Sequence, residues 1–481
     1  MSDAIATPVA ATLFAYQVGF GDCFLLRFDY CDGTRRHVLI DFGTTGLTID
    51  SPKEQMVVIA NDIAAKCDGK LDVVVATHRH ADHISGFATN RAGTASGDVI
   101  RGLKPAVVVQ PWTEAPDAPV GWEGPEGEDK HKSFAMRSQS LAAMDGIARL
   151  ARDTIEAGTL RLPKAIADQM HFIGEDNIAN KSAVENLATM GDRNAFVFHG
   201  CDPGLAAILP GIDVTVLGPP TLRQTETISK QKAKDKDDFW HLAPLQFAHA
   251  VGVAPAADDD DEDDDAVVIP VSTRRSASVR RKRTSELFPE AEIFSSGKLR
   301  VSDRWIAGRV DEANGDMMLG IVRALDNQMN NTSVILLFKA GSKKLLFPGD
   351  AQLENWKYAL SSPLADQLDD VDLYKVGHHG SLNATPKTMW SRLKKKSEDK
   401  DKQDRLTSVM STRDGKHGHL KDSTEVPRTN LVKELKKESA LCDTRNLPKG
   451  QLYAEVTFDL TDDGQISIVS GAASAVGNTQ A

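Results

Sequence analysis

The feature that most constrains this chain is a cluster of three histidines and one aspartate between His78 and His83, directly after the largely apolar stretch 71–76. An apolar run of this length predicts a buried strand, so the polar side chains that follow it are expected to gather at one end of that strand. Imidazoles and carboxylates bind divalent metal ions, and a pair of such ions can activate water and bind both oxygens of a displacement reaction. Because the chain has only 13 histidines in 481 residues, three in one hexad favour a metal site over a solvated polar loop.

Two later segments carry further ligand-type residues, each at the end of an apolar run. The segment 342–350 predicts a strand that delivers the carboxylate of Asp350 through a glycine turn. The segment 371–381 predicts a second strand, which ends in the pair His378 and His379. Adjacent strand residues point to opposite faces, so one histidine is expected to bind metal and the other to meet substrate, unless a turn redirects both. The residues alone leave open which histidine does which.

The chain resembles the hydrolase domain of ComEC-type competence proteins and their soluble relatives, a branch of the metallo-β-lactamase-fold hydrolases. Seven segments in order carry the resemblance, and the hexad among them has the spacing His-x-His-x-Asp-His. They are Val18–Leu26, Leu39–Gly43, His78–His83, Asn330–Val334, Pro348–Asp350, Val376–Ser381, and Ser408–Ser411 with the Gly-His pair at 417–419. The order of the segments is more specific than any one of them.

This resemblance implies an α/β protein with the four-layer αββα metallo-β-lactamase sandwich and two bound divalent ions. The implied metal ligands are His78, His80, Asp82, His83, Asp350 and His378, with the first two on one ion, the next two on the other and Asp350 between them. The implied catalytic residues are Asp82, Asp350, His379 and His419. Additional site residues would be Asp22, Asp41, Asn330 and Asn331.

The chain departs from the wider fold family at one ligand position. Many members place another histidine between the hexad and the bridging aspartate, whereas the corresponding strand here is expected to open with Asn330 and Asn331 and lacks a nearby histidine. An amide oxygen is a harder and weaker ligand than imidazole, which favours manganese alongside zinc. ComEC-type domains share this asparagine. The alternative is that the two asparagines merely start a strand.

Periodicity predicts the local elements around the motifs. Alternating apolar residues indicate an opening antiparallel pair over Thr12–Arg27 and His37–Asp41, which places Asp41 where it can support a ligand of the hexad. Helical spacing is found over 52–67 and 133–157, a helix is expected to start between Ile84 and Asn90, and a strand is expected over Val214–Leu217.

The order of the motifs predicts one large domain with an insertion, although 481 residues could hold two or three domains on length alone. The chain is 41% hydrophobic and 26% charged, enough to bury a sizeable core. We expect the fold to occupy 10–218 and 328–475, separated by an insertion over 219–327. The insertion holds an acidic run, 258–265, and a basic run, 274–283. Like charges repel and supply no apolar mass, so the sequence predicts that this insertion is disordered or loosely tethered.

The two charged runs allow three interpretations. They are a solvated linker, or the basic run is a nuclear-localisation signal, which the bacterial character of the chain disfavours. In the third, the acidic run mimics a phosphodiester backbone and inhibits the site until a trypsin-like protease cuts within 274–283. Some soluble relatives of the resembled family occur beside such proteases in phage-defence loci, so the resemblance implies activation by cleavage.

Charge and cysteine content bound the cellular setting. Five scattered cysteines indicate free thiols in a reducing cytoplasm. The absence of an 18-residue apolar run and of a basic leader predicts neither a membrane span nor a signal peptide, so this chain is expected to be the hydrolase part alone. A net charge of −11 argues against a nucleic-acid-coating protein but not against a nuclease, whose phosphate contacts are local.

Together with the metal-ligand pattern, the resemblance implies a metal-dependent phosphodiesterase, namely a nuclease acting on DNA, with a role in antiviral defence. It does not separate DNA from RNA. Hydrolysis of a small ester, lactone, thioester or phosphocholine substrate is an alternative, because the same metal pair serves all of these reactions. An alternative of another class is a regulatory binding module with an inactive site.

Overall fold

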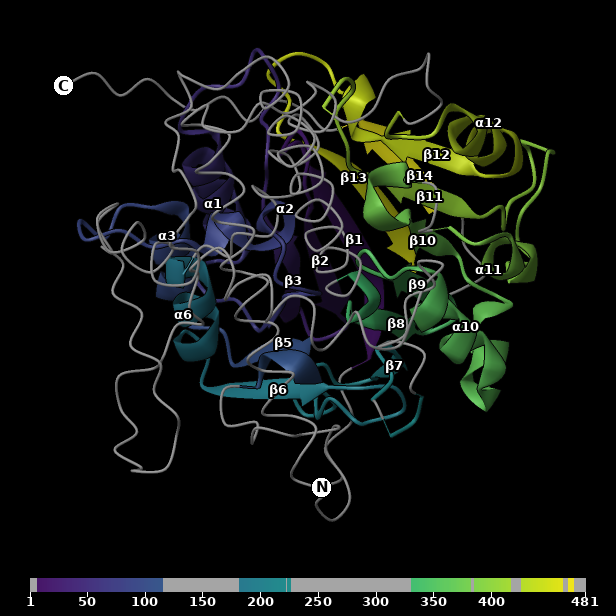
Figure 1. Cartoon of the computed structure of the whole chain (residues 1–481), viewed down its shortest axis with the longest axis horizontal. Helices are drawn as coiled ribbons and strands as arrows, with labels where there is room; N and C mark the ends of the chain where they lie inside the picture. Colours follow the sequence, from purple (N-terminus) through teal and green to yellow (C-terminus); the bar gives the residue numbers. More distant parts are fainter. Residues whose placement is uncertain are drawn as a thin grey trace, which may run out of the picture. The chain divides into compact units, whose positions relative to one another are not determined.

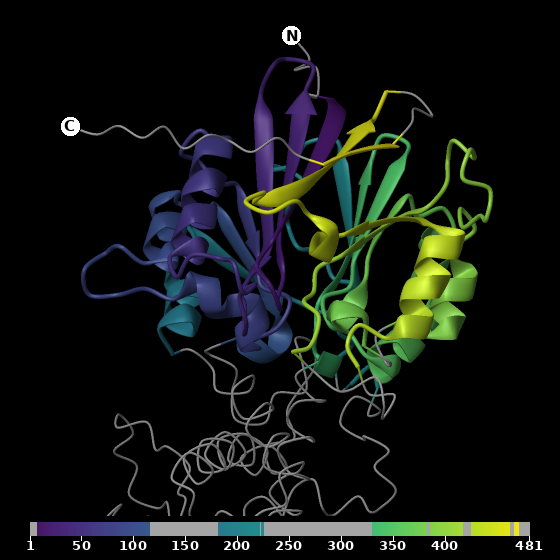
Figure 2. The same ribbon diagram turned by 90° about the horizontal axis from the view of Figure 1, so that it is seen from above.

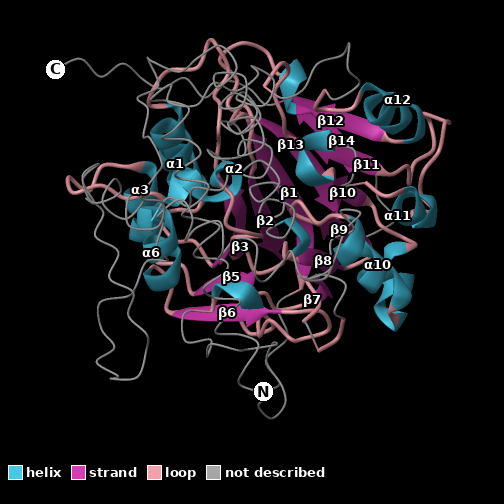
Figure 3. Ribbon diagram, in the orientation of Figure 1, coloured by secondary structure: helices cyan, strands magenta, loops and turns pink. Residues whose placement is uncertain are grey.

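Two mixed β-sheets form the framework of the computed structural model (Figure 1). The structure describes residues 7–115, 181–221, 223–225, 330–381, 385–416, 425–461 and 466–470. All of them belong to one compact unit. Figure 3 distinguishes the helices from the strands in the same orientation.

The larger sheet has eight strands in the order β14-β13-β1-β2-β3-β4-β5-β6. Their bounds are β1 Pro8–Tyr16, β2 Cys23–Tyr30, β3 Arg35–Phe42, β4 Val73–Val75, β5 Val107–Pro111, β6 Arg193–Val197, β13 Tyr453–Asp459 and β14 Ile466–Ser470. The strands from β14 to β3 pair antiparallel, and those from β3 to β6 pair parallel. The predicted antiparallel opening is thus confirmed as β1, β2 and β3.

The smaller sheet has six strands in the order β12-β11-β10-β9-β8-β7. Their bounds are β7 Ile212–Gly218, β8 Ile335–Ala340, β9 Lys343–Phe347, β10 Leu373–Lys375, β11 Thr407–Met410 and β12 Ala440–Asp443. The four strands from β12 to β9 are parallel, while β8 and β7 complete the sheet antiparallel. The strands predicted over 214–217, 342–350 and 371–381 are confirmed as β7, β9 and β10.

Side-chain alternation divides the core into three clusters. Along β3, Val38 and Ile40 face a cluster that also contains residues of the smaller sheet, such as Phe347, whereas Leu39 faces the opposite way. The ring of Phe347 lies 6.2 Å from that of Phe24 on β2. The inner faces of the two sheets therefore share one apolar core.

Helices cover the face of each sheet that points away from this core (Figure 2). The larger sheet packs against α1 Gln55–Lys66, α3 Ser96–Gly102 and α6 Lys181–Thr189. The smaller sheet packs against α10 Leu353–Ser361, α11 Lys387–Arg392 and α12 Thr429–Glu438. The helix predicted over 52–67 is confirmed as α1. No helix within the described segments has the length and apolar character needed to cross a membrane.

Two predicted boundaries are wrong. The helix expected to start between Ile84 and Asn90 is a short helix, α2, over Ala81–Ile84, followed by a 3-10 turn over Ser85–Phe87. It starts earlier because His80 is extended and serves as its N-terminal flanking residue. The strand expected to open at Asn330 starts at Ile335, because the chain first makes a turn in which the N–H of Ser333 donates to the carbonyl of Asn330. The helix predicted over 133–157, the insertion 219–327 apart from 219–221 and 223–225, and 417–419 lie outside the described residues.

The parallel strands bring their carboxyl ends to one edge of each sheet. β3, β4 and β5 end together in the larger sheet, and β9, β10, β11 and β12 end together in the smaller one. Because β1 and β2 are antiparallel to each other and β2 is antiparallel to β3, the turn 17–22 between them lies at that same edge of the larger sheet. The predicted ligands follow these strand ends.

Candidate metal centre

The hexad leaves the larger sheet from the end of β4, which is buried between β3 and β5. His78 and His80 lie in the connecting loop, while Asp82 and His83 lie in the first turn of α2. A glycine is required where α2 meets the end of β3: a Cβ on Gly43 would lie 2.5 Å from backbone atoms of both Asp82 and His83. The absent side chain lets the helix pack directly on the strand end.

Asp350 reaches the same place from the smaller sheet. It follows β9 through the turn at Gly349, which has a left-handed φ of 55°. A Cβ on Gly349 would lie 2.7 Å from the Cβ of Thr77, so only glycine allows this close approach to the loop after β4. The N–H of Val334 also donates to the carbonyl of Thr77 over 2.9 Å, which joins the two sheet edges.

The paired histidines follow β10 in a turn that the strand pattern does not predict. His378 and His379 both have left-handed backbones, with φ of 43° and 51°, which are uncommon for residues other than glycine. The turn places the His379 ring in the buried cluster and leaves the His378 side chain 26% exposed. The backbone N–H of His378 donates to Oδ1 of Asp350 over 3.0 Å.

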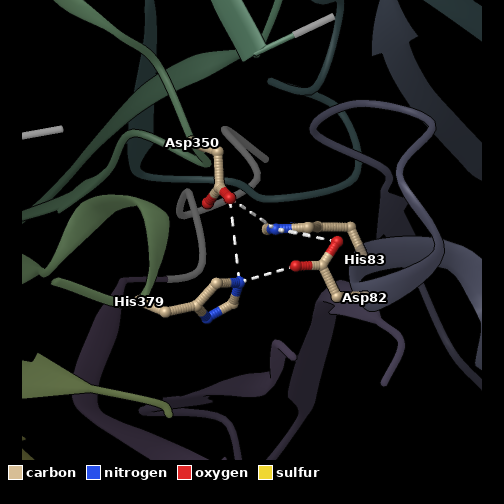
Figure 4. Close-up of side chains that lie close together, drawn as sticks. All are labelled: Asp82, His83, Asp350 and His379. Atoms are coloured by element: carbon tan, nitrogen blue, oxygen red, sulfur yellow. Dashed lines mark hydrogen bonds and ion pairs between the residues drawn. The ribbon is translucent and has the colours of Figure 1, made fainter. Parts of the chain in front are cut away.

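Four of the predicted residues converge in one buried cluster: Asp82, His83, Asp350 and His379 (Figure 4). Nε2 of His379 lies 2.8 Å from Oδ2 of Asp82 and 3.7 Å from Oδ2 of Asp350. Nε2 of His83 lies 3.1 Å from the same Asp350 oxygen. Each residue offers one ligand atom, and these atoms lie within 4.8 Å of one another.

A second cluster is formed by His78, His80 and Asp82. Nε2 of His78 faces Nδ1 of His80 at 3.0 Å, and all three side chains are buried. Asp82 belongs to both clusters. The structure therefore contains two adjacent groups of ligand-type side chains that meet at one carboxylate.

A third group, Asp22, Asp41 and His83, lies on the other side of the His83 ring. Nδ1 of His83 is 2.8 Å from Oδ2 of Asp41 and 3.8 Å from Asp22, whereas its Nε2 faces Asp350. The N–H and hydroxyl of Thr77 also donate to Asp41, over 2.7 and 2.8 Å. Because Asp41 bonds the ring nitrogen that points away from Asp350, it orients His83 from behind.

His379 is oriented in the same way. Its Nδ1 lies 3.0 Å from the carbonyl oxygen of Ser411, which follows β11. Burial opposes ionisation of the ring, but the nearby carboxylates, led by Asp350, outweigh it and raise the pKa of His379, so both ring nitrogens are hydrogen-bonded, Nδ1 to Ser411 and Nε2 to Asp82. Ser411 belongs to one of the segments that carry the resemblance, and its backbone carbonyl is the group that contacts His379.

Lys375, to which the sequence analysis gave no role, is a buried cation at the base of the site. Its Nζ forms an ion pair with Asp22, lies 3.5 Å from Oδ1 of Asp350 and donates to the carbonyl of Gly349 over 3.1 Å. A lysine in an otherwise apolar strand is the sequence feature that could have identified this residue as part of the site. Burying an ammonium group requires an acidic partner, so Lys375 indicates a carboxylate near the end of β10.

Burial and neighbouring charges separate the protonation states of the site. Burial lowers the pKa of His78, and it lowers the pKa of His80 to about 4, so both are neutral and able to bind metal. Burial also opposes ionisation of His83, but the nearby carboxylates, led by Asp350, outweigh it and raise the pKa of His83. In Asp350 the effect of burial is outweighed by His83 and then Lys375, which lower the pKa of this carboxyl and keep it ionised.

Polar atoms without hydrogen bonds indicate that the side chains present fit a cation. Oδ1 of Asp82 is buried and has no hydrogen-bond partner among the described residues. Both polar atoms of the fully buried Asn330 side chain are in the same state. Unsatisfied buried polar groups are costly, and a bound ion is one way of satisfying them. Together with the neutral imidazoles of His78 and His80 and the ionised carboxylates, they form a buried site that can hold a divalent metal ion.

The remaining predicted residues are distributed as follows. Nδ2 of Asn331 donates to Oε2 of Glu354 over 3.0 Å. Nε2 of His378 lies 3.9 Å from Oδ2 of Asp350, so its ring borders the first cluster. His419 lies outside the described residues. The individual role of each residue stays a prediction.

Comparison with known proteins does not assign the chain to a family. No family model matches the chain, and no curated protein sequence is significantly similar to it.

Proposed function

We propose that the protein is a metal-dependent phosphodiesterase of the metallo-β-lactamase fold, with DNA as its substrate and two bound ions, zinc or manganese. The observation that carries the proposal is the pair of buried His/Asp clusters that share Asp82. In this proposal, the helices on the outer faces and the two sheets between them are the four layers of the αββα sandwich.

Each ion would have its own set of ligands. His78, His80 and Asp82 would hold one ion, and Asp82, His83, Asp350 and His379 would hold the other. The side-chain oxygen of the buried Asn330, which has no hydrogen-bond partner among the described residues, would be a further ligand. Bound ions would supply Lewis acidity towards a phosphoryl group and would lower the pKa of water.

The chain's own residues fix the orientation of these ligands. The two oxygens of Asp350 have separate environments: Oδ1 accepts the His378 N–H and faces Lys375, and Oδ2 faces His83 and His379. The carboxylate thus presents one oxygen to the ligand cluster while the protein holds the other. Such preorganisation reduces the reorganisation needed during the reaction.

We assign the proton-transfer role to His378 rather than His379. His379 is fully buried and bonded at both ring nitrogens, to Ser411 and Asp82. The His378 side chain is partly exposed, and burial lowers its pKa, so its neutral ring can contact a substrate phosphate or accept a proton. His419 remains a second proposed contact on sequence grounds alone.

The test is hydrolysis of a chromogenic phosphodiester, plasmid DNA, RNA, a lactone and a thioester by purified protein loaded with zinc, manganese or magnesium. Asp82→Asn should lower the rate on DNA by several orders of magnitude. The matched control is Asp72→Asn, because Asp72 is also buried but lies at the opposite edge of the larger sheet, bonded to the N–H of His37. Cleavage of a lactone or thioester with no phosphodiester cleaved would replace the nuclease proposal with the small-ester alternative.

We also propose, from the sequence alone, that the enzyme acts in the cytoplasm in antiviral defence and that a trypsin-like protease cutting within 274–283 activates it. The positions concerned lie outside the described residues.

A further inference from the structure

A groove of about 420 Å³ lies among the loops that follow β1, β3, β11 and β12. It is lined by Gln17, Gln55 and the segments 48–52, 412–414 and 447–452 together with Arg445. Its volume lies within the range of about 300–1,000 Å³ that is usual for ligand sites. None of its lining residues belongs to the two ligand clusters.

The strand directions place this groove at the same edge as the clusters. Its walls follow the ends of β1, β3, β11 and β12, which are the strand ends that meet at the site. One segment connects the groove to the ligand cluster. The carbonyl of Ser411 lies 3.0 Å from Nδ1 of His379, and the next two residues, Thr412 and Arg413, line the groove. Two residues of extended chain span about 7 Å, which is on the scale of one nucleotide.

Arg413 contributes a positive charge to the groove. Its guanidinium donates to the carbonyl of Leu47, and it forms no ion pair within the part of the chain that the structure describes. The other two cations of the groove are neutralised, Lys449 by Asp50 at 3.2 Å and Arg445 by Asp443 and Asp414. In a chain with a net charge of −11, a fixed cation beside the site is suited to an anionic ligand.

Ile49 adds an apolar contact on the wall of the same groove. Its side chain is 90% exposed, the highest value among the three exposed large apolar side chains of the described residues. A single exposed isoleucine is ordinary on a protein surface. Beside an arginine held by the carbonyl of Leu47, however, it gives the groove an apolar surface that can contact a base next to a cation that can contact a phosphate.

We propose that this groove binds the nucleotide next to the scissile phosphodiester, with Arg413 on its phosphate and Ile49 against its base. The choice of ligand rests on the proposed function. The groove then extends the site from one phosphodiester to a strand, and it determines preference for a polynucleotide over a small diester.

The test measures the binding of two fluorescein-labelled oligonucleotides of 12 nucleotides, oligo-dT and oligo-U, to the full-length protein in EDTA. Fluorescence anisotropy gives the affinities at several salt concentrations. Arg413→Met should weaken binding by about 10-fold and reduce the slope of log K against log salt by about one. Ile49→Ser should weaken binding by about 5-fold with little change in slope. Arg413→Lys retains the charge and should recover most of the affinity.

Matched controls remove the same groups elsewhere. Arg35→Met removes an exposed cation at the start of β3, at the opposite edge, and Ile468→Ser removes an exposed isoleucine on β14. Neither should change affinity. The proposal would be overturned if the groove variants bound as tightly as the wild type, or if the controls lost as much affinity as the groove variants. It would also be overturned if the wild type did not bind the oligonucleotides.

Hydrolysis of a chromogenic phosphodiester by metal-loaded wild type separates this result from the proposed function. A protein that cleaves the small diester while its groove variants bind oligonucleotides normally has the proposed activity but not this groove function. A protein that loses oligonucleotide affinity in the groove variants but cleaves no diester has the groove and lacks the activity. The dT and U probes distinguish DNA from RNA.

Discussion

Oδ2 of Asp41 lies 2.8 Å from Nδ1 of His83, on the side of the ring opposite to Asp350. Asp41 holds this position with a left-handed backbone, at φ 54°. Asp41 therefore orients His83, a proposed metal ligand, through the ring nitrogen that points away from the proposed metal site.

Replacing Asp41 by asparagine should therefore weaken metal binding without removing a ligand. The amide would place a donor against Thr77 or His83, and the loss of such an outer partner lowers metal affinity by about 10–100-fold. Competition with a chromogenic zinc chelator measures the change. Asp62→Asn is the control, since Asp62 also accepts a hydroxyl hydrogen bond, from Tyr16 over 2.6 Å, in a different part of the fold. Equal affinities in both variants would contradict the prediction.

Asp82 should matter more for metal content than any other ligand, because it alone belongs to both clusters. We expect His80→Ala to lose one bound ion and Asp82→Ala to lose both. Elemental analysis of the purified variants provides the measurement. If the two variants retain the same metal content as wild type, the assignment of the clusters to metal ions is wrong.

Lys375→Met should destabilise the metal-free protein by about 3–5 kcal/mol, since removing one partner of a buried ion pair leaves the other charge uncompensated. The carboxylate left behind is Asp22, which is fully buried. Adding Asp22→Asn removes that charge and should restore part of the lost stability. Urea unfolding of the wild type, the two single variants Lys375→Met and Asp22→Asn, and the double variant gives the coupling energy between the two residues. Additive effects of the two substitutions would show that the pair is not a unit.

His37 predicts an acid-dependent loss of stability that is independent of the metal centre. Burial lowers the pKa of His37 to about 4. The unfolded chain binds a proton at this residue near pH 6.5, whereas the folded chain does so only near pH 4, so the stabilisation is complete above pH 6.5 and is lost as pH falls towards 4. The slope is about 1.4 kcal/mol per pH unit within this window. Unfolding free energies measured in EDTA should fall less steeply in His37→Gln than in wild type, and identical slopes would contradict the pKa.

The acidic run 258–265 should inhibit DNA cleavage, a prediction that depends on the sequence alone. Eight carboxylates compete with phosphates for cations. Replacing the run by glycine and serine, or cutting within 274–283 with trypsin, should raise the rate of DNA cleavage. The same treatments applied to an Asp82→Asn protein control for contaminating nuclease. An unchanged or lower rate would return the insertion to the role of a linker.

The sequence predicted the strands near the site well because each is a short apolar run followed by turn residues. It also placed Asp41 correctly behind the hexad, where it bonds His83. It could not separate His378 from His379, since the two left-handed residues reverse the alternation on which a strand-based prediction depends. Nor could it pair Lys375 with Asp22, because that contact forms only when strands far apart in the chain become neighbours in space.

The shared cluster joins Asp82 and His83, from the first part of the chain, to Asp350 and His379, from the later part. A ribosome producing this protein must therefore pass residue 379 before the four side chains can meet, and a nascent chain that ends before residue 350 lacks two of them. Under the proposed function, a nascent chain therefore has no complete site for nucleic acid until residue 379 has been synthesised.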